Sequence, residues 1–420
     1  PVLPMPPMWS FTFPIVSEQG MNPIVVDVDD SLGQKDHVVQ SYYYSTQYYP
    51  VDIADPAASQ IADGLVLFLG PEVWDDNDTS DVDDIATIIG LYLANMDLST
   101  LITNPVTTGS TAGCDYKVNV YNIRYGTPTV DLVPTNGGLN LGVTIPNFRA
   151  DIDIPTKGTF CVIPDIDGDV TATSVTITGK MNVALDPTGQ PVVTMTNVVA
   201  TVNGLDVDIG GVLGFLTNWL INFFEGSFAD MIEDALVDQI SSLADSLEDA
   251  LAGLALNESF EIPSFIEGGA PTTLSLVSKL SRLDFMPAGG TVGMAATIVT
   301  PKGTPHNPLG SIGRAACLTG VPEAMPGFPV GTPIPTPPAL ELGLHDDFLN
   351  LIPYALYWAG TLTMPIPQEM LGQDLSSYGI TDMSLNVDFM LPPILTGCND
   401  DGLLTIQAGD IGVQADMKLF

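Results

Sequence analysis

Short apolar bursts and strict alternation of apolar and polar residues run through most of the chain, so the pattern predicts strands almost throughout. Alternation with a period of two marks residues 116–121, 140–145, 170–178 and 192–196, where every second side chain points to the same face. Several of these runs exceed the length of about 5–6 residues that is typical of a strand. Long antiparallel strands with one apolar face predict a large, strongly curved sheet.

Helical spacing interrupts this pattern at two short segments. Residues 82–93 carry Ile85, Ile88 and Ile89 at helical intervals behind a run of aspartates, and acidic residues favour the N-terminal end of a helix. Residues 345–352 follow a strand in the same manner. Both segments are expected to be helices.

A third and stronger helical signal covers residues 212–254. Apolar residues recur there every three or four positions, while acidic residues mostly occupy the other face, which predicts one long amphipathic helix. We expect this helix to lie against the concave face of the curved sheet. Its stripe consists of Leu213, Leu216, Leu220, Phe223, Phe224, Ile232, Leu236, Ile240, Leu243, Leu247 and Leu251.

The order of elements repeats along the chain. A strand, an acidic helix start, a helix and further strands occupy residues 64–125, and the same order returns after residue 265. This repetition predicts two modules built on one plan. We expect a linker at residues 51–63, a first module at 64–265, and a central sheet with an incomplete second module at 266–420.

The first 50 residues contain three strand-like bursts, at residues 11–13, 22–30 and 37–44. Their pattern, with a "G-x-N-x-I-x-V-x-x-x-D" strand, resembles the closing strands of a bacterial immunoglobulin-like module. A sandwich of this kind needs about seven strands, so the missing ones are expected upstream or in a partner. The sequence starts at Pro1 without an initiator Met or signal peptide and ends within a strand. It is therefore expected to be part of a longer chain.

Charge excludes two classes of partner. The 420 residues include 50 Asp and Glu against 11 Lys and Arg, a net charge of −39. Binding to nucleic acid or to anionic headgroups depends on Lys and Arg, so neither nucleic-acid binding nor electrostatic membrane binding is expected. A hydrophobic content of 45% with only 15% charged residues predicts a folded chain. No stretch reaches the ~18 consecutive apolar residues of a membrane span.

The four cysteines, Cys114, Cys161, Cys317 and Cys398, form two separated pairs without a CxxC motif. Their even number in an acidic chain favours two disulfides and an exported protein, located outside the cell, on its surface or in the periplasm. Pairing within modules would join Cys114 to Cys161 and Cys317 to Cys398. Four free buried thiols in a cytosolic protein are the alternative.

Several motifs together resemble the bactericidal/permeability-increasing, lipopolysaccharide-binding and lipid-transfer protein superfamily, in a bacterial form. They are "GLVLFLGPEVWDDNDTSDVDDIATIIGLYL", "SLEDALAGLALNESFEIPSF" and the "L-G-L-x-D-x-F-x-N" run at residues 342–350 with "G-x-L-x-M" at 360–364. The resemblance implies an α+β fold of two pseudo-symmetric modules, each a highly curved antiparallel sheet wrapped on a long helix, here after an immunoglobulin-like segment. It also implies an apolar tunnel for acyl chains. The cationic tip of antimicrobial members is missing.

Motifs for catalysis are absent. The three histidines, His37, His306 and His345, are far apart in the sequence, and the chain has no HExxH, no GxSxG and no Gly-rich phosphate loop. No catalytic residue is assigned and no enzyme activity is expected. His345 stands at a predicted helix start, where a capping or surface role is expected.

Calcium is the one metal that the sequence suggests. Asp165, Asp167 and Asp169 alternate around Gly168 and offer the hard oxygen ligands that Ca²⁺ prefers. The run does not complete an EF-hand, because no Glu stands at the twelfth position of the loop. Solvated turns are the alternative interpretation.

Two functional hypotheses follow. The first is an exported, non-enzymatic protein that holds a lipid or other hydrophobic molecule in an apolar tunnel. The second is an extracellular structural or adhesive protein with a packed interior, using the immunoglobulin-like segment for a protein partner or self-assembly. A ligand-lining stripe and a core stripe have the same periodicity, so sequence does not separate them. The expected tunnel residues are Ile85, Ile88, Ile89, Leu213, Leu216, Leu220, Phe224, Phe348 and Ile352.

Overall fold

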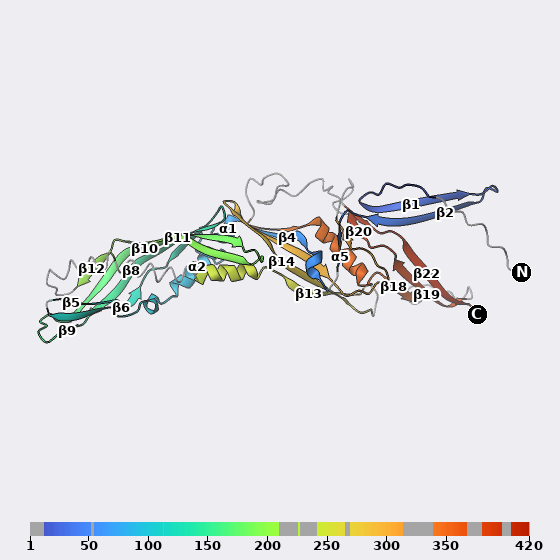
Figure 1. The fold of residues 1–420 in the computed structure, drawn as a ribbon. Helices are drawn as coiled ribbons and strands as arrows, with labels where there is room; N and C mark the ends of the chain where they lie inside the picture. Colours follow the sequence, from blue (N-terminus) through green and yellow to red (C-terminus); the bar gives the residue numbers. More distant parts are fainter. Residues whose placement is uncertain are drawn as a thin grey trace.

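The structure is a computed structural model that describes residues 12–51, 54–111, 113–209, 226, 242–264, 269–313, 339–367, 380–396 and 405–419. Its described parts form an elongated molecule with a large curved sheet at one end, a second sheet in the middle and several small sheets at the other end (Figure 1). Among the described residues, no helix is long and apolar enough to cross a bilayer.

The curved sheet is antiparallel and contains eight strands. Five of them pair in the order β11, β10, β8, β6 and β5. The other three pair beside this path, β12 with β10, β7 with β8 and β9 with β6. The strands predicted at residues 116–121, 140–145, 170–178 and 192–196 all lie in this sheet. The bounds are β5 (Thr107–Thr111), β6 (Cys114–Arg124), β7 (Thr129–Thr135), β8 (Gly138–Ile154), β9 (Thr156–Lys157), β10 (Ile166–Leu185), β11 (Pro191–Asn203) and β12 (Asp206–Ile209).

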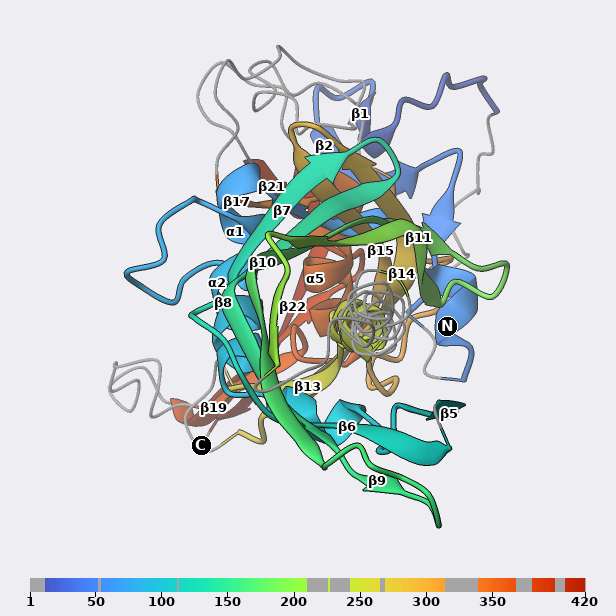
Figure 2. The ribbon, with the colours of Figure 1, turned by 90° about the vertical axis from the view of Figure 1, so that its left-hand side faces the viewer.

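Alternation along these strands gives the sheet one buried face. Along most of β8 every second residue is buried, and β10 follows a similar pattern with one change of phase between Ala172 and Val175. The buried side chains include Leu139, Leu141 and Val143. Figure 2 shows the sheet curling partly around the helical residues 242–252. Helix α2 (Ile85–Ala94) packs against β7, so the predicted helix at residues 82–93 is confirmed.

The middle sheet joins segments that are far apart in the sequence. Its antiparallel order is β13, β14, β15, β4 and β17. Strand β4 therefore lies between β15 and β17, and β17 begins more than 270 residues after β4 ends. Every residue of β15 is buried, as expected for an inner strand covered on both faces. The bounds are β4 (Ile61–Leu69), β13 (Asn257–Ile262), β14 (Thr272–Met286), β15 (Gly289–Val299) and β17 (Leu340–Leu344).

In its described residues, the far end has one helix and four small sheets. Helix α5 (Asp346–Trp358) follows β17, and a three-stranded sheet has the order β18, β19 and β22. The other sheets are the pairs β20–β21, β3–β16 and β1–β2. The bounds are β1 (Gly20–Asp29), β2 (Lys35–Tyr44), β3 (Tyr48–Tyr49), β16 (Ser311–Ile312), β18 (Met364–Pro367), β19 (Ile380–Phe389), β20 (Ile394–Thr396), β21 (Thr405–Gln407) and β22 (Ile411–Leu419).

The predicted fold class, with a long helix inside each of two modules, is wrong. Strands make up 54% and helices 14% of the structure, and the helices are short beside two half-barrel sheets. Those described are α1 (Pro71–Trp74), α2, α5 and residues 242–252, besides the 3₁₀ turns η1 (Pro56–Ser59) and η2 (Leu98–Leu101). Helical periodicity identifies the apolar face of a helix, but it does not show how much of the core that helix supplies. Here the long strands supply most of the buried residues. Of the long helix expected over residues 212–254, residues 212–225 and 227–241 lie outside the described residues.

The N-terminal segment forms a hairpin in which β1 and β2 pair over ten residues each. Both strands were expected from the sequence. Thr12 and Phe13, expected in a third strand, lie outside any strand. Of the three strands expected from an immunoglobulin-like module, the described structure therefore contains two, which pair with each other.

Candidate functional site

A small apolar cavity lies between the curved sheet and the helices that cover it. Its volume is about 30 Å³, which exceeds the roughly 10–15 Å³ that one water needs, but a water there would find no polar side chain, and apolar cavities stay dry. The cavity therefore favours an apolar occupant. Its lining consists of Trp74, Ile85, Ile89, Leu132, Leu139, Leu141, Met181, Leu243 and Leu247.

The single turn of α1 places Trp74 in this lining. The indole Nε1–H donates to the carbonyl of Leu69 at 3.3 Å, and the ring packs on Phe285 with centroids 5.4 Å apart. Only 1% of Trp74 is exposed. With its one polar group satisfied, the indole offers the cavity an apolar surface.

Asp84 fixes the start of α2. Its carboxylate accepts from the amide of Thr87 at 2.7 Å and from the Thr87 hydroxyl at 3.0 Å, which is the bonding pattern of an N-cap. The negative charge also lies at the positive end of the helix dipole. Because the helix begins at the next residue, Ile85 and Ile89 lie one turn apart and both line the cavity.

Tyr125 fixes the other end of α2. Its hydroxyl is shared between the carbonyl of Leu93, in the last turn of the helix, and the carbonyl of Met96, just after the helix. Burial raises the pKa of Tyr125, so the phenol keeps its proton at neutral pH and remains a donor. The helix is thus held at both ends over the curved sheet.

The helical residues 242–252 form the remaining wall of the cavity. Leu243 and Leu247 line the cavity, and Leu251 is buried below them. Glu248 was expected on the solvent face, but its carboxylate accepts from the amide of Val193 in β11 at 3.1 Å. This bond attaches the helix to the edge of the curved sheet.

The predicted tunnel residues are not all brought together. Ile85 and Ile89 line the cavity, whereas Ile88 is 52% exposed. Phe348 is buried in α5 and Ile352, one turn later, is 36% exposed; neither of them lines the cavity. Leu213, Leu216, Leu220 and Phe224 lie outside the described residues.

Several lining residues were not named in the sequence interpretation. Leu139 and Leu141 belong to an alternating strand whose inward face was predicted without a site being assigned to it. Leu132, Met181 and Trp74 had no signal of their own, because no local pattern distinguishes a residue beside a cavity from one in a packed core. Their roles come from the tertiary structure alone.

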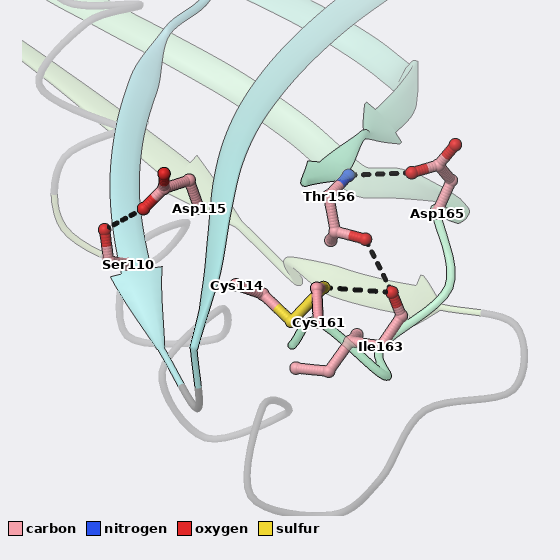
Figure 3. The surroundings of a disulfide bond; sticks show 7 residues. All are labelled: Ser110, Cys114, Asp115, Thr156, Cys161, Ile163 and Asp165. Atoms are coloured by element: carbon pink, nitrogen blue, oxygen red, sulfur yellow. Dashed lines mark hydrogen bonds between the residues drawn. A yellow bond between two sulfur atoms is a disulfide. The ribbon is translucent and has the colours of Figure 1, made fainter. Parts of the chain in front are cut away.

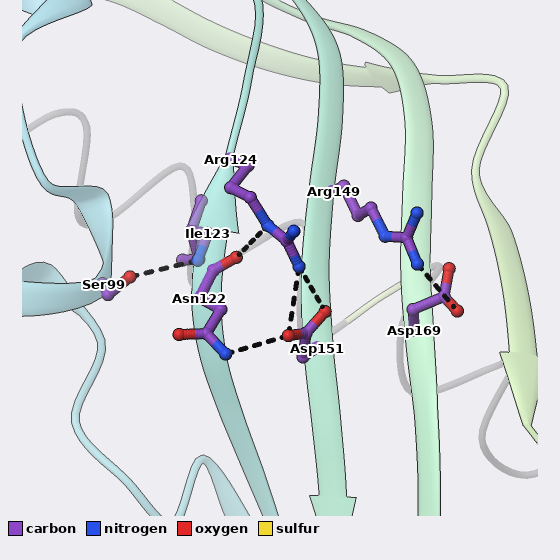
Figure 4. Close-up of polar contacts among 7 residues, drawn as sticks. All are labelled: Ser99, Asn122, Ile123, Arg124, Arg149, Asp151 and Asp169. Carbon is purple, nitrogen blue, oxygen red and sulfur yellow. Dashed lines mark hydrogen bonds and ion pairs between the residues drawn. The ribbon is translucent and has the colours of Figure 1, made fainter.

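The predicted calcium ligands do not converge on one another. Asp169 pairs with Arg149 at 3.4 Å, next to a second pair formed by Arg124 and Asp151 (Figure 4). The carboxylate of Asp165 accepts from the amide of Thr156 at 2.7 Å. Asp167 lies on β10 beside Asp153 of β8. Calcium binding at these residues stays a prediction.

Two other groups of acidic and histidine side chains come within ligand distance of one another among the described residues. They are Asp76 with Asp83 and Asp84, and His345 with Asp346 and Asp347. Each group stands at a helix N-terminus, where Asp84 and His345 are the N-caps. The capping role expected for His345 is confirmed. The capping bonds account for the position of both side chains without a metal.

A disulfide joins Cys114 to Cys161 across the narrow end of the curved sheet (Figure 3). Cys114 begins β6, and Cys161 follows β9, where the carbonyl of Ile163 accepts from the Thr156 hydroxyl at 2.6 Å. The predicted pairing of these two cysteines is confirmed. Cys317 and Cys398 lie outside the described residues.

Comparison with known proteins gives a likeness of fold only. No protein-family model and no curated protein matches the sequence. Among solved structures, a lipopolysaccharide binding protein is similar with a TM-score of 0.47 and 16% identity, over 85% of this chain and 74% of that one. Neither the bacterial type nor the immunoglobulin-like segment is supported by this likeness, and it says nothing about the ligand of this chain.

Proposed function

We propose that this chain is an exported, non-enzymatic protein that binds an acyl chain or another apolar molecule in its first module. The observation that carries the proposal is the small cavity with an apolar described lining. Removing a methylene group from water contributes about 0.8 kcal/mol. A described lining without charges, whose one indole N–H is already bonded to the backbone, selects for chains of this kind over polar molecules.

The walls of the cavity differ in how firmly they are packed. Leu132 and Leu139 belong to the sheet and are fully buried, whereas Leu243 and Leu247 on the helical wall are only partly buried. A void of about 30 Å³ does not hold a whole acyl chain. We therefore propose that the ligand enters beside Leu243 and Leu247 and enlarges the cavity by displacing this wall.

The Cys114–Cys161 disulfide supports an exported location, because disulfides persist in oxidising compartments. The net charge of −39 supports an apolar rather than an electrostatic mode of lipid contact. Of the described basic side chains, Arg124 and Arg149 are paired with carboxylates of the curved sheet. A phosphate headgroup would have to compete for them.

The small volume also favours a second candidate function. If the interior is simply packed, the module is a scaffold for an extracellular structural or adhesive protein. The two functions differ in one measurable property, which is whether an apolar molecule is retained when the protein is purified.

The test is native mass spectrometry of the purified chain, together with titration of an apolar fluorescent dye. Ile89→Phe places a larger side chain in a void of this size and should abolish retention of lipid or dye. Ile88→Phe changes the exposed neighbour on the same helix and should bind like the parent. Ile89→Asp, which puts an unpaired carboxylate into the cavity, should have the same effect as Ile89→Phe, provided that circular dichroism shows it folded.

Two results would contradict the proposal. The first is a parent protein that carries no co-purifying lipid and binds no dye. The second is equal binding by Ile88→Phe and Ile89→Phe. Either result would make the stripe ordinary core and favour the scaffold function.

A further inference from the structure

A second cavity, unlike the first, lies at the far end of the molecule. It is an open cleft of about 370 Å³ formed by segments that are up to about 350 residues apart in the sequence. Its lining combines four aromatic rings with two short segments outside helices and strands. The lining consists of Tyr43, Tyr48, Tyr357 and His306 with residues 307–309 and 390–392.

Tyr43 and Tyr48 form a fixed aromatic corner in this cleft. Their ring centroids are 6.0 Å apart and the ring planes are inclined by 73°. The Tyr43 hydroxyl donates to the carbonyl of Gly310 at 3.4 Å, and the Tyr48 hydroxyl accepts from the amide of Ser45 at 3.1 Å. Burial raises the pKa of Tyr43, so its ring is a neutral phenol. Each hydroxyl is thus engaged with the backbone.

Tyr357 and His306 form a second aromatic surface. The two rings are stacked with centroids 6.1 Å apart and 13° between their planes. Tyr357 is 2% exposed, and its hydroxyl donates to the carbonyl of Met390 at 3.1 Å. Burial raises the pKa of Tyr357 to about 12. The ring is therefore neutral and held in place.

A carboxylate lies next to these rings. Oδ2 of Asp388 is 2.9 Å from Nε2 of His306, and its Oδ1 accepts from the Thr363 hydroxyl at 3.0 Å. Among the residues that the structure describes, no Lys or Arg belongs to the lining of this cleft. Lys302 stays outside the lining, with its ammonium 5.0 Å from the centre of the Trp358 ring and bonded to Oδ1 of Asn307.

We infer that this cleft binds an organic cation with a trialkylammonium group. Aromatic faces attract cations through the ring quadrupole. Three tyrosines line the cleft, the carboxylate of Asp388 lies next to them, and the described lining contains neither Lys nor Arg, so the cleft favours a cation. A trialkylammonium group is also apolar at its surface, which suits Leu309, Met390 and Pro392 in the lining. A sugar could stack on the same rings, but it carries no positive charge.

The experiment titrates the full chain with choline and with 3,3-dimethylbutan-1-ol, its neutral analogue of the same shape, by calorimetry. Choline should bind about tenfold more tightly than the neutral analogue. Phosphatidylcholine and phosphatidylglycerol vesicles form a second arm, which distinguishes a lipid headgroup from a free cation as the source. In either arm, the proposal requires that free choline binds and that the phosphatidylglycerol vesicles do not compete with it.

Substitutions assign the binding to the aromatic corner. Tyr48→Leu should weaken choline binding about tenfold, since it removes one ring, whereas Tyr48→Phe keeps the ring and should bind like the parent. Tyr44→Leu, next to Tyr43 but outside the lining, is the matched control. Equal affinity for choline and its neutral analogue, preference for a sugar, or unchanged binding by a folded Tyr48→Leu would overturn the proposal. Ile89→Phe should leave choline binding intact, so failure of the apolar cavity would be distinguished from failure of this cleft.

Discussion

The curved sheet and the N-terminal hairpin consist of the same kind of strand but have opposite surroundings. β10 lies between β8 and β11, and one face of it is buried over nearly its whole length. β1 and β2 pair only with each other among the described strands, and Val25, Val38 and Val39 remain about half exposed. Alternation therefore identifies a strand, but a second layer decides whether its apolar face is buried.

The hairpin is attached mainly at its base. Both carboxylate oxygens of Asp410 lie 2.8 Å from the amide of Ser41, which donates to them, and Gly409 packs closely against Met21 and Ser41. Figure 1 shows the rest of the hairpin extending from the end of the molecule. At its tip, the turn is held by Asp30, which accepts from the amides of Leu32 and Gln34. The curved sheet has helices on its concave face, and the hairpin has only this base.

The largest effect expected from this difference is the response to a buried charge. Leu139→Asp places an unpaired carboxylate on the covered face of β8, at a fully buried position, and should prevent the first module from folding, since such burial costs several kcal/mol. Val39→Asp makes the same kind of change in the hairpin, where 49% of the side chain is exposed, and should change the free energy of unfolding by less than about 1 kcal/mol. Urea unfolding of both variants measures the difference. Equal losses would show that the hairpin is covered in solution.

The disulfide should have the next largest effect. Cys114 and Cys161 close a loop with a sequence separation of 47, for which loss of chain entropy in the unfolded state corresponds to about 4 kcal/mol. The double variant Cys114→Ser/Cys161→Ser should lose a stability of this order in urea, with the curved sheet responding and the hairpin unaffected. Hydrogen exchange resolves the two regions. A loss spread evenly over both would contradict the view that they are stabilised independently.

The N-cap of α2 gives a smaller effect. Asp84→Ala removes both bonds to Thr87 and should reduce the free energy of unfolding by about 0.5–2 kcal/mol, and it should also weaken binding of an apolar dye, because Ile85 and Ile89 depend on the start of this helix. Asp83→Ala is the control, since Asp83 is exposed and does not cap the helix. Thermal unfolding followed by circular dichroism, with the dye titration, tests both. Normal dye binding by Asp84→Ala would mean that the helix starts correctly without its cap.

Sequence reasoning succeeded where the signal is local. Strands were found from their alternation, α2 and α5 from their spacing, and the Cys114–Cys161 pairing from its position within one module. It failed where the answer depends on contacts across the chain. Helical spacing put Ile85, Ile88 and Ile89 into one set, yet only the first and last line the cavity. The aromatic cleft brings Tyr43 next to Tyr357, and no local pattern joins residues so far apart.

The smallest expected effect concerns the cap of α5, which, unlike Asp84, titrates near neutral pH. Nδ1 of His345 lies 3.1 Å from Oδ1 of Asp346 and also 3.1 Å from the amide of Asp347. When the ring of His345 is neutral, Nδ1 accepts from the amide of Asp347. When the ring is protonated, Nδ1 donates to Asp346 instead, and the amide of Asp347 then donates to Oδ1 of Asp346 at 3.0 Å. The hydrogen bond with Asp346 raises the pKa of His345 above its usual range, against the opposing effect of burial.

A histidine whose pKa is raised by folding stabilises the folded state while it is protonated. This contribution is fully present below the ordinary pKa of about 6.5 and is lost as the pH rises through the higher folded value. Since 41% of the side chain is exposed, solvent screening should keep it below about 1 kcal/mol. His345→Asn supplies a cap that does not titrate, so urea unfolding at pH 5.5 and 8.5 should show a loss with rising pH in the parent that is smaller in the variant. The same pH dependence in both proteins would mean that a group other than His345 titrates. The start of α5 would then be stabilised, like the curved sheet, by packing that does not depend on pH.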